Sequence, residues 1–204
     1  MIILISGKMG SGKTTVARDL QIEILKRGFV PRMLKFADPL YQFHDEIRSM
    51  LKSIDPKNTI NYDYGKKDGN LLQLLGTEWG RTYIDENVWV KLLMSRVHQM
   101  PTNHIKIIDD CRFRNELLIP KTMAEKTGEK IVSIRLECDV EIRRKRCTMW
   151  RDKDNHPSET DLDDYARRPF FDYVFNTGLE RGAEGTNPIC QIVLDDILQN
   201  YELL

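Results

Sequence analysis

The chain has 204 residues, of which 41% are hydrophobic and 30% charged, a composition typical of one globular domain with a sizeable core. Lysine plus arginine equals aspartate plus glutamate at 31 each, so no overall basic field favours nucleic acid as a stable partner. The first apolar run ends at Ile5, too short for a signal peptide or a membrane span, and the four cysteines form no C-x-x-C pair. We therefore expect a cytoplasmic protein without a membrane partner.

The first predicted element is a buried strand at 2–5, followed by Gly7-Lys8-Met9-Gly10-Ser11-Gly12-Lys13-Thr14 and a helical pattern that begins at Thr15. This stretch fits the pattern G-x-x-x-x-G-K-[ST], and a strand before it and a helix after it are the setting that the pattern requires. Its glycines allow successive backbone N–H groups to surround a phosphate at the start of the helix. The alternative, a glycine-rich turn that binds nothing, lacks a reason for the lysine and threonine.

The loop predicts contacts with ATP and magnesium. Lys13 is expected to reach the β- and γ-phosphates, and the Thr14 hydroxyl to bind Mg²⁺. The ATP-binding residues predicted from this segment are Gly7, Gly10, Ser11, Gly12, Lys13, Thr14 and Thr15.

A second strand is predicted at 32–36 and ends at Asp38. Ligands gather beyond the carboxyl ends of strands in such sheets, so Asp38 is a candidate for chemistry, or else it starts the helix that follows. Helices are predicted from 39 to 51 and from Asp85 to Val97, with a polar segment at 55–67 between them. Gln73, Thr77 and Arg81 are spaced four apart and share one face if the helix around them continues through Gly76 and Gly80.

The third predicted strand, 105–108, runs into Asp109 and Asp110. A carboxylate at the end of such a strand holds Mg²⁺ or its waters in phosphate-loop enzymes. Alternation along a strand points the two side chains to opposite faces, so only one of them is expected to address the site.

An arginine-rich stretch follows the fourth predicted strand, 130–136. Guanidinium groups bind phosphate through two parallel hydrogen bonds, so this stretch predicts a phosphate-closing lid at about 139–169, with a solvated helix face as the alternative. The arginines expected to bind ATP are Arg143, Arg146 and Arg151. A last strand at 170–175 and a helix capped by Asn187 and Pro188 complete the chain.

Strands alternate with helices from end to end, and the strands are almost continuously apolar. This pattern predicts a mainly parallel sheet covered on both faces, that is, a three-layer α/β/α fold. We expect a single domain over 1–204, with substrate-binding helices at about 40–100 and the lid inserted in it.

Three further segments give the chain a resemblance to a known family. With the phosphate-binding loop, the stretches 36–40, 74–81 and 110–116 make the chain similar to the deoxynucleoside monophosphate kinases of bacteriophages. The similarity extends to 156–159 and 171–174. It implies ATP, Mg²⁺ and a deoxynucleoside monophosphate as ligands, ADP and the diphosphate as products, and the host cytoplasm as location.

The resemblance also implies roles for individual residues. Lys13, Asp110, Arg112 and Glu116 are expected to be catalytic, with Asp110 joining Thr14 at the metal. The acceptor is expected to contact Asp38, Gln73, Thr77, Arg81, Trp89 and Arg112. For Trp89, an ordinary place in the core is the alternative to stacking on the base.

Two other functions remain open from the sequence alone. A kinase similar to dephospho-coenzyme A kinase would phosphorylate a sugar hydroxyl and could use Asp38 as base. A nucleotide-binding module without catalysis is the second alternative, although no Asn-Lys-x-Asp guanine-reading motif is present. The sequence does not decide which bases are accepted, whether ribose is excluded, or whether the chain forms a homodimer.

Overall fold

The computed structural model describes residues 1–57, 59–147, 156–166, 169–178 and 188–200, with the side chains of 198–200 left aside. The chain divides into two compact units. Met1–Lys35 together with Met94–Leu204 form the first, which we call the sheet unit. Phe36–Leu93 form the second, which we call the helical unit, and it lies within the segment predicted to hold the substrate-binding helices.

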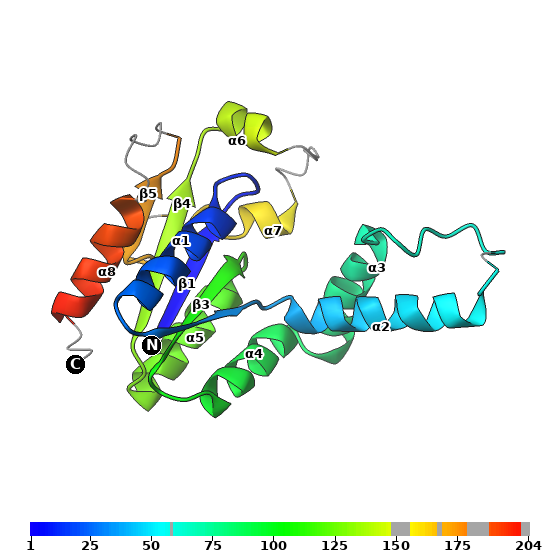
Figure 1. Cartoon of the computed structure of the whole chain (residues 1–204), viewed down its shortest axis with the longest axis horizontal. Helices are drawn as coiled ribbons and strands as arrows, with labels where there is room; N and C mark the ends of the chain where they lie inside the picture. The colour runs from blue at the N-terminus through cyan, green and yellow to red at the C-terminus, as the bar shows by residue number, and fades with distance from the viewer. Residues whose placement is uncertain (58, 148–155, 167–168, 179–187, 201–204) are drawn as a thin grey trace. The chain divides into compact units, whose positions relative to one another are not determined.

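The sheet unit contains a five-stranded parallel sheet (Figure 1). Its strands are β1 (Ile2–Gly7), β2 (Val30–Leu34), β3 (His104–Cys111), β4 (Ile131–Glu137) and β5 (Tyr173–Asn176). The spatial order is β2-β3-β1-β4-β5, so β1 lies in the middle with β3 and β4 as its neighbours. The carboxyl ends of β1 and β3 therefore lie side by side, which brings the segments that follow them together.

Helices cover the sheet on both faces, which confirms the predicted three-layer α/β/α fold. Those of the sheet unit are α1 (Lys13–Lys26), α5 (Arg114–Thr127), α6 (Val140–Arg146), α7 (Pro157–Thr160) and α8 (Pro188–Asn200). Helix α4 (Val88–Gln99) begins in the helical unit and ends in the sheet unit. The last helix begins at the predicted Pro188, whereas Asn187 lies outside the described residues. No helix within the described ranges is long and apolar enough to cross a membrane.

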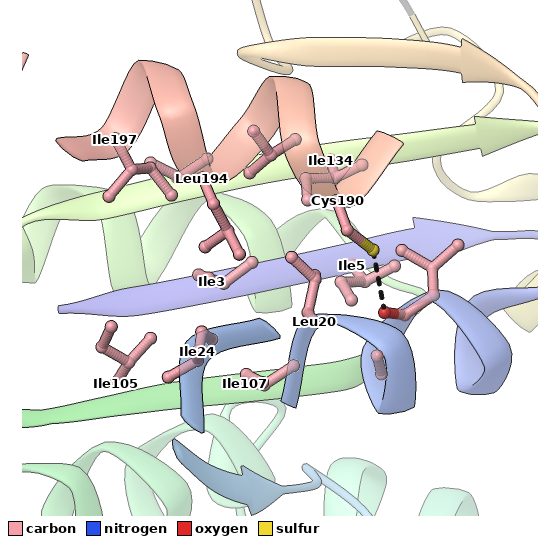
Figure 2. Packing of buried hydrophobic residues seen from close by; sticks show 14 of the residues in the cluster. Ile3, Ile5, Leu20, Ile24, Ile105, Ile107, Ile134, Cys190, Leu194 and Ile197 are labelled. Carbon is pink, nitrogen blue, oxygen red and sulfur yellow. Dashed lines mark hydrogen bonds between the residues drawn. The ribbon is translucent and has the colours of Figure 1, made fainter. Parts of the chain in front are cut away.

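One apolar cluster joins α1 and α8 to the sheet (Figure 2). Ile3 and Ile5 of the central strand meet Leu20 of α1 and Leu194 of α8, and all of them are buried. Ile2 and Leu4 point to the opposite face of β1 and are also fully buried. Because both faces of β1 are apolar and covered, the position of the loop that follows this strand is firmly set.

The predicted strand boundaries need two corrections. The second strand runs over 30–34 rather than 32–36, and the last over 173–176 rather than 170–175. In the last case Asp172 ends the irregular segment, because its carboxylate accepts hydrogen bonds from the backbone N–H and hydroxyl of Ser133, each at 2.7 Å. Side-chain hydrogen bonds to the backbone thus decide where ladder pairing with β4 begins.

The helical unit contains α2 (Asp38–Ile54), α3 (Gly69–Gln73) and a π-helix, η1 (Leu74–Ile84), followed by the first half of α4. The polar segment between α2 and α3 is organised by Asp55, which is 5% exposed. Its carboxylate accepts hydrogen bonds from the backbone N–H groups of Thr59 and Ile60 and from the hydroxyls of Thr59 and Tyr64. This segment, predicted from composition to be a loop, is therefore tied together by one carboxylate.

Replacing Asp55 by asparagine is expected to destabilise the protein above about pH 4. The hydrogen bonds from Thr59, Ile60 and Tyr64 lower the pKa of Asp55 from 3.8 to about 2. A carboxyl whose pKa is lowered by folding contributes stability above its unfolded pKa and loses it as the pH falls through the folded value. The midpoint of urea unfolding, followed by tryptophan fluorescence, should differ most between wild type and D55N at pH 7 and converge near pH 2.

Glu78 is an exposed carboxylate of the same unit and provides the control. The variant E78Q should keep the wild-type dependence of the midpoint on pH. Equal midpoints for wild type and D55N at pH 7 would show that Asp55 does not stabilise this segment.

Candidate active site

The phosphate-binding loop connects β1 to α1 and has the backbone that its glycines were expected to provide. Gly10 and Gly12 have φ values of 80° and 91°, in the left-handed region that residues with a Cβ rarely adopt. A Cβ on Gly10 would also lie 2.8 Å from the carbonyl oxygen of Arg143, whereas one on Gly12 would meet nothing within 4 Å. Gly12 is thus required by backbone conformation alone, and Gly10 by conformation and by the close approach of α6.

Lys13 is the first residue of α1, and its side chain bends back over the loop. Its Nζ donates to the carbonyl oxygens of Gly7 at 2.6 Å and Lys8 at 2.9 Å. Burial, and then the positive charge of Arg112, lower the pKa of Lys13 to about 7. An anionic phosphate beside Nζ would favour the charged form and raise this pKa again. A phosphate bound beside the amine would therefore be stabilised by its positive charge.

Thr14 and Asp109 form the pair expected at a magnesium site. The Thr14 hydroxyl donates to Oδ2 of Asp109 at 3.1 Å, and Asp109 is 3% exposed. Asp110 is the next residue on β3 and is only partly buried, and the register of β3 against β1 shifts at this point. The carboxylate that reaches Thr14 is thus Asp109, the alternative that the strand pattern had left open, and not Asp110, which was predicted to join Thr14 at the metal.

The donor set fits a magnesium ion shared with nucleotide phosphates. Oδ1 of Asp109 accepts no hydrogen bond within the described part of the chain, although Nζ of Lys35 lies 3.2 Å away. In the same part of the chain, no three His, Cys, Asp or Glu side chains gather at one point. Mg²⁺ commonly takes one or two protein oxygens and completes its shell with phosphates and water, which is what Thr14 and Asp109 offer.

Arg112 follows β3, and two glutamates hold it in place. Its backbone N–H donates to Oε2 of Glu116 at 2.7 Å, and Phe113 N–H donates to the same oxygen at 3.1 Å. Its guanidinium Nη1 donates to Oε1 of Glu159. Glu116 is 3% exposed and braces the turn into α5, so the structure gives this predicted catalytic residue a role in holding the backbone.

An acidic segment at 156–166, which lies within the predicted arginine-rich lid, contains no predicted site residue. Three of its carboxylates contact the phosphate-binding loop or the start of α5. Glu159 accepts from Met9 N–H at 2.7 Å, Asp163 pairs with Lys8 at 2.8 Å, and Asp161 accepts from Arg114 N–H at 2.7 Å. The only sequence signal was the run of acids itself, because nothing in its spacing indicates which bases it meets. In the described part of the lid, carboxylates as well as arginines therefore contact the loop region.

The predicted ATP-binding arginines have different positions. Arg143 is 4% exposed and donates to the carbonyl oxygens of Cys138 and Met9, both at 3.2 Å. It therefore binds the backbone of the phosphate-binding loop. Arg146 is exposed and donates to the carbonyl oxygen of Thr177 at 2.8 Å. Arg151 lies outside the described residues.

A buried arginine that the sequence analysis did not select lies under the loop. Arg135 of β4 is 3% exposed, and its Nη1 donates to the Ser6 hydroxyl at 3.1 Å. Its Nη2 lies 3.4 Å from Asp163 and its Nε 2.6 Å from Glu137. The alternation of β4 was visible in the sequence, but only the tertiary structure shows that this position faces the site.

Most of the predicted acceptor-binding residues belong to the helical unit. Asp38 is the first residue of α2, directly followed by Pro39, which supports its reading as a helix start. Gln73 ends α3, and Thr77 and Arg81 lie on η1, where Gln73 and Thr77 are exposed. The chain stays helical through both glycines, and its i→i+5 bonding gives slightly more than four residues per turn. Positions four apart therefore stay close to one face, and Gln73, Thr77 and Arg81 share a side of this helical stretch, as the spacing predicted.

Trp89 is a core residue of the helical unit, which corrects its proposed place against the base. It is 1% exposed, and its Nε1–H donates to the carbonyl oxygen of Gly76 at 2.9 Å. A Cβ on Gly80 would lie 2.3 Å from the indole ring. Gly80 thus lets the indole lie directly on the helix backbone, and Gly76 supplies the carbonyl oxygen that the indole N–H binds.

The substitution W89F is expected to lower the free energy of unfolding by about 1–3 kcal/mol, because Gly76 loses its donor and the smaller ring leaves a gap. The KM for the acceptor should stay within about twofold of wild type, since a ring held inside the unit does not contact a ligand. Urea unfolding and steady-state kinetics measure the two effects.

The matched control is W79F, because Trp79 is 42% exposed and meets only the edge of Phe43 among the described ring pairs. Its expected effect on unfolding is below about 1 kcal/mol. A tenfold rise in the KM of W89F with unchanged stability would instead place Trp89 at the base.

Comparisons with known proteins show the fold of the chain. No family model matches it, and no curated protein matches its sequence. Among solved structures, it is similar to APS kinase CysC of Mycobacterium tuberculosis in complex with AMPPNP and APS, with 12% identity, a TM-score of 0.52 and 95% of each chain covered. It is also similar to Kti12 of Chaetomium thermophilum in complex with ADP-AlF3, with 14% identity, a TM-score of 0.55, and 96% and 98% covered. The chain therefore has the P-loop NTPase fold found in kinases.

Proposed function

We propose that the protein is a deoxynucleoside monophosphate kinase that transfers the γ-phosphate of ATP to a deoxynucleoside monophosphate. The observation that carries this proposal is the arrangement of Lys13, the Thr14–Asp109 pair and Arg112 at the carboxyl ends of two neighbouring strands. The first three match the donor side of a P-loop kinase. The acceptor is inferred from the resemblance carried by the stretches 36–40, 74–81 and 110–116.

The solved structures support the donor side of the proposal. The APS kinase structure holds AMPPNP beside a small-molecule acceptor, and the Kti12 structure holds ADP-AlF3. An ATP-dependent phosphotransferase on a small molecule is consistent with this fold, and the resemblance narrows the acceptor to a nucleotide.

In the proposed reaction, an oxygen of the acceptor phosphate attacks the γ-phosphorus in line. That oxygen is ionised at neutral pH, so the reaction needs no general base. The protein aligns the two substrates and stabilises charge: Lys13 and the loop amides hold the donor phosphates, and Arg112 neutralises the acceptor phosphate. A Mg²⁺ ion held by Thr14 and Asp109 would neutralise charge on the β- and γ-phosphates.

The test is a coupled assay of ADP release with ATP and Mg²⁺. Each deoxy- and ribonucleoside monophosphate is offered as acceptor, together with dephospho-coenzyme A and, as a blank, no acceptor. Turnover on one or more deoxynucleotides, well above hydrolysis without acceptor, is the expected result and gives the base preference directly. Turnover on dephospho-coenzyme A alone would support the alternative kinase. No turnover on any acceptor, with ATP still bound, would support a non-catalytic nucleotide-binding module.

A further inference from the structure

We propose that Glu159 is a positioning residue, whose carboxylate holds the Arg112 guanidinium beside the phosphate-binding loop, ready for the acceptor phosphate. This inference rests on the proposed function. Glu159 is not a predicted contact of either substrate, and it acts through Arg112 and the loop.

Glu159 joins the loop to the arginine through its two separate oxygens. Oε2 accepts from Met9 N–H at 2.7 Å, and Oε1 accepts from Nη1 of Arg112. The carboxylate is 6% exposed, whereas the Arg112 side chain is 31% exposed. A buried carboxylate with a different donor on each oxygen has little freedom, so it fixes the guanidinium relative to the loop backbone.

An arginine needs such support to serve as a phosphate ligand. Its long side chain has many rotamers, and their entropy is lost on binding unless the group is already held. Glu116 fixes the backbone of Arg112, and Glu159 fixes its far end, so both ends are set before a ligand arrives. Since a guanidinium has five N–H donors, the bond at Nη1 leaves others for a phosphate.

The segment that carries Glu159 is itself anchored to the sheet unit. Asp161 accepts from Arg114 N–H at 2.7 Å, and Asp163 pairs with Lys8 at 2.8 Å. These contacts lie just after α7. They hold the segment that carries Glu159 against the start of α5 and the phosphate-binding loop. The positive charge of Arg112 also lowers the pKa of Lys13, which shows that the two cations share one electrostatic environment.

The opposite role makes an opposite prediction. If the carboxylate of Glu159 occupied the place of the acceptor phosphate, it would compete with the substrate for Arg112. Removing its charge would then lower the acceptor KM. The positioning role predicts a higher KM, because the freed guanidinium must be ordered by the substrate itself.

The experiment is a double-mutant cycle of wild type, E159Q, R112A and the double variant, measured as kcat/KM for the best acceptor. Glutamine has the size of glutamate but cannot accept from both donors, since one of its two terminal groups is an amide NH₂. We expect E159Q to lose about 10- to 100-fold, mainly through the acceptor KM. In the R112A background the same change should cost less than about threefold, because its target is gone.

Three results would overturn the inference. Equal losses in both backgrounds would show that Glu159 acts only on the fold. Unchanged activity of E159Q would show that Arg112 needs no support. A lower acceptor KM would show competition. The variant E159D, which keeps both oxygens on a shorter stem, should recover part of the loss.

Asp164 provides the matched control, because it lies on the same segment, its side chain is 84% exposed, and it forms an ion pair with the exposed Arg114. The variant D164N should equal wild type in kcat/KM. Melting temperatures of all variants show whether each is folded. The variant E159A, which removes both carboxylate oxygens, repeats the test with a larger change.

A separate readout distinguishes failure of this inference from failure of the proposed function. If wild type turns over no monophosphate, the proposed function fails, and the cycle is measured as the dissociation constant of inorganic pyrophosphate by calorimetry. E159Q should then bind pyrophosphate more weakly than wild type only when Arg112 is present. Binding as tight as wild type would overturn the positioning role.

Discussion

Replacing Lys13 by alanine is expected to lower kcat by at least about 10³-fold while leaving the protein folded. The amine of Lys13 is buried over the loop, where it would bind the phosphates directly, and burial makes a charge contact stronger than it is in water. Since the burial of this amine already lowers its pKa to about 7, its removal relieves a desolvation cost, and the melting temperature should not fall. The coupled ADP-release assay and a thermal melt measure the two effects.

The matched control is K26A, at the other end of the same helix. Lys26 is 63% exposed and forms an ion pair with Glu23 on the same helix. It should keep kcat within about twofold of wild type. If K13A kept more than a tenth of wild-type turnover, the loop would not be the donor site and the proposed mechanism would fail.

The pair D109N and D110N is expected to separate the two aspartates of β3. D109N should lower kcat at least about 10²-fold and raise the Mg²⁺ concentration needed for half-maximal rate, because Asp109 is the carboxylate that reaches Thr14. D110N should lose less, and its dependence on Mg²⁺ should stay that of wild type, because the hydrogen bond from Thr14 is accepted by Asp109.

The measurement is a titration of MgCl₂ at saturating ATP and acceptor for both variants. The two substitutions are matched in size and charge, and they lie one residue apart, so a difference between them reports orientation. A shifted Mg²⁺ requirement in D110N and not in D109N would return the metal role to Asp110.

The sequence by itself determined the layers of the fold and the location of the loop. Apolar strands alternating with helices admit few arrangements other than a covered parallel sheet, and strand, loop and helix together specify the phosphate-binding loop. The helical pattern that begins at Thr15 is also found, as α1, and Gly28 follows its end with a φ of 84°. These features depend on near neighbours in the chain, so patterns along the sequence reveal them.

The tertiary structure decided which side chains meet. Whether Asp109 or Asp110 contacts Thr14 depends on the register of β3 against β1, which shifts beside these two residues. The placement of Trp89 depends on the missing side chain of Gly80 and on the backbone carbonyl of Gly76, 9 and 13 residues before it. Contacts between positions far apart in the chain leave no periodic trace in a single sequence, so reasoning from spacing could not find them.

Glu159 shows the same limit most clearly. It lies 150 residues from Met9 and 47 from Arg112, and its carboxylate contacts both. In the sequence, an acid two residues after a proline predicts only the start of a short helix. Its partners depend on the tertiary fold, which brings Glu159 beside the phosphate-binding loop and Arg112. A carboxylate buried there is stable only because donors from both of these segments reach it.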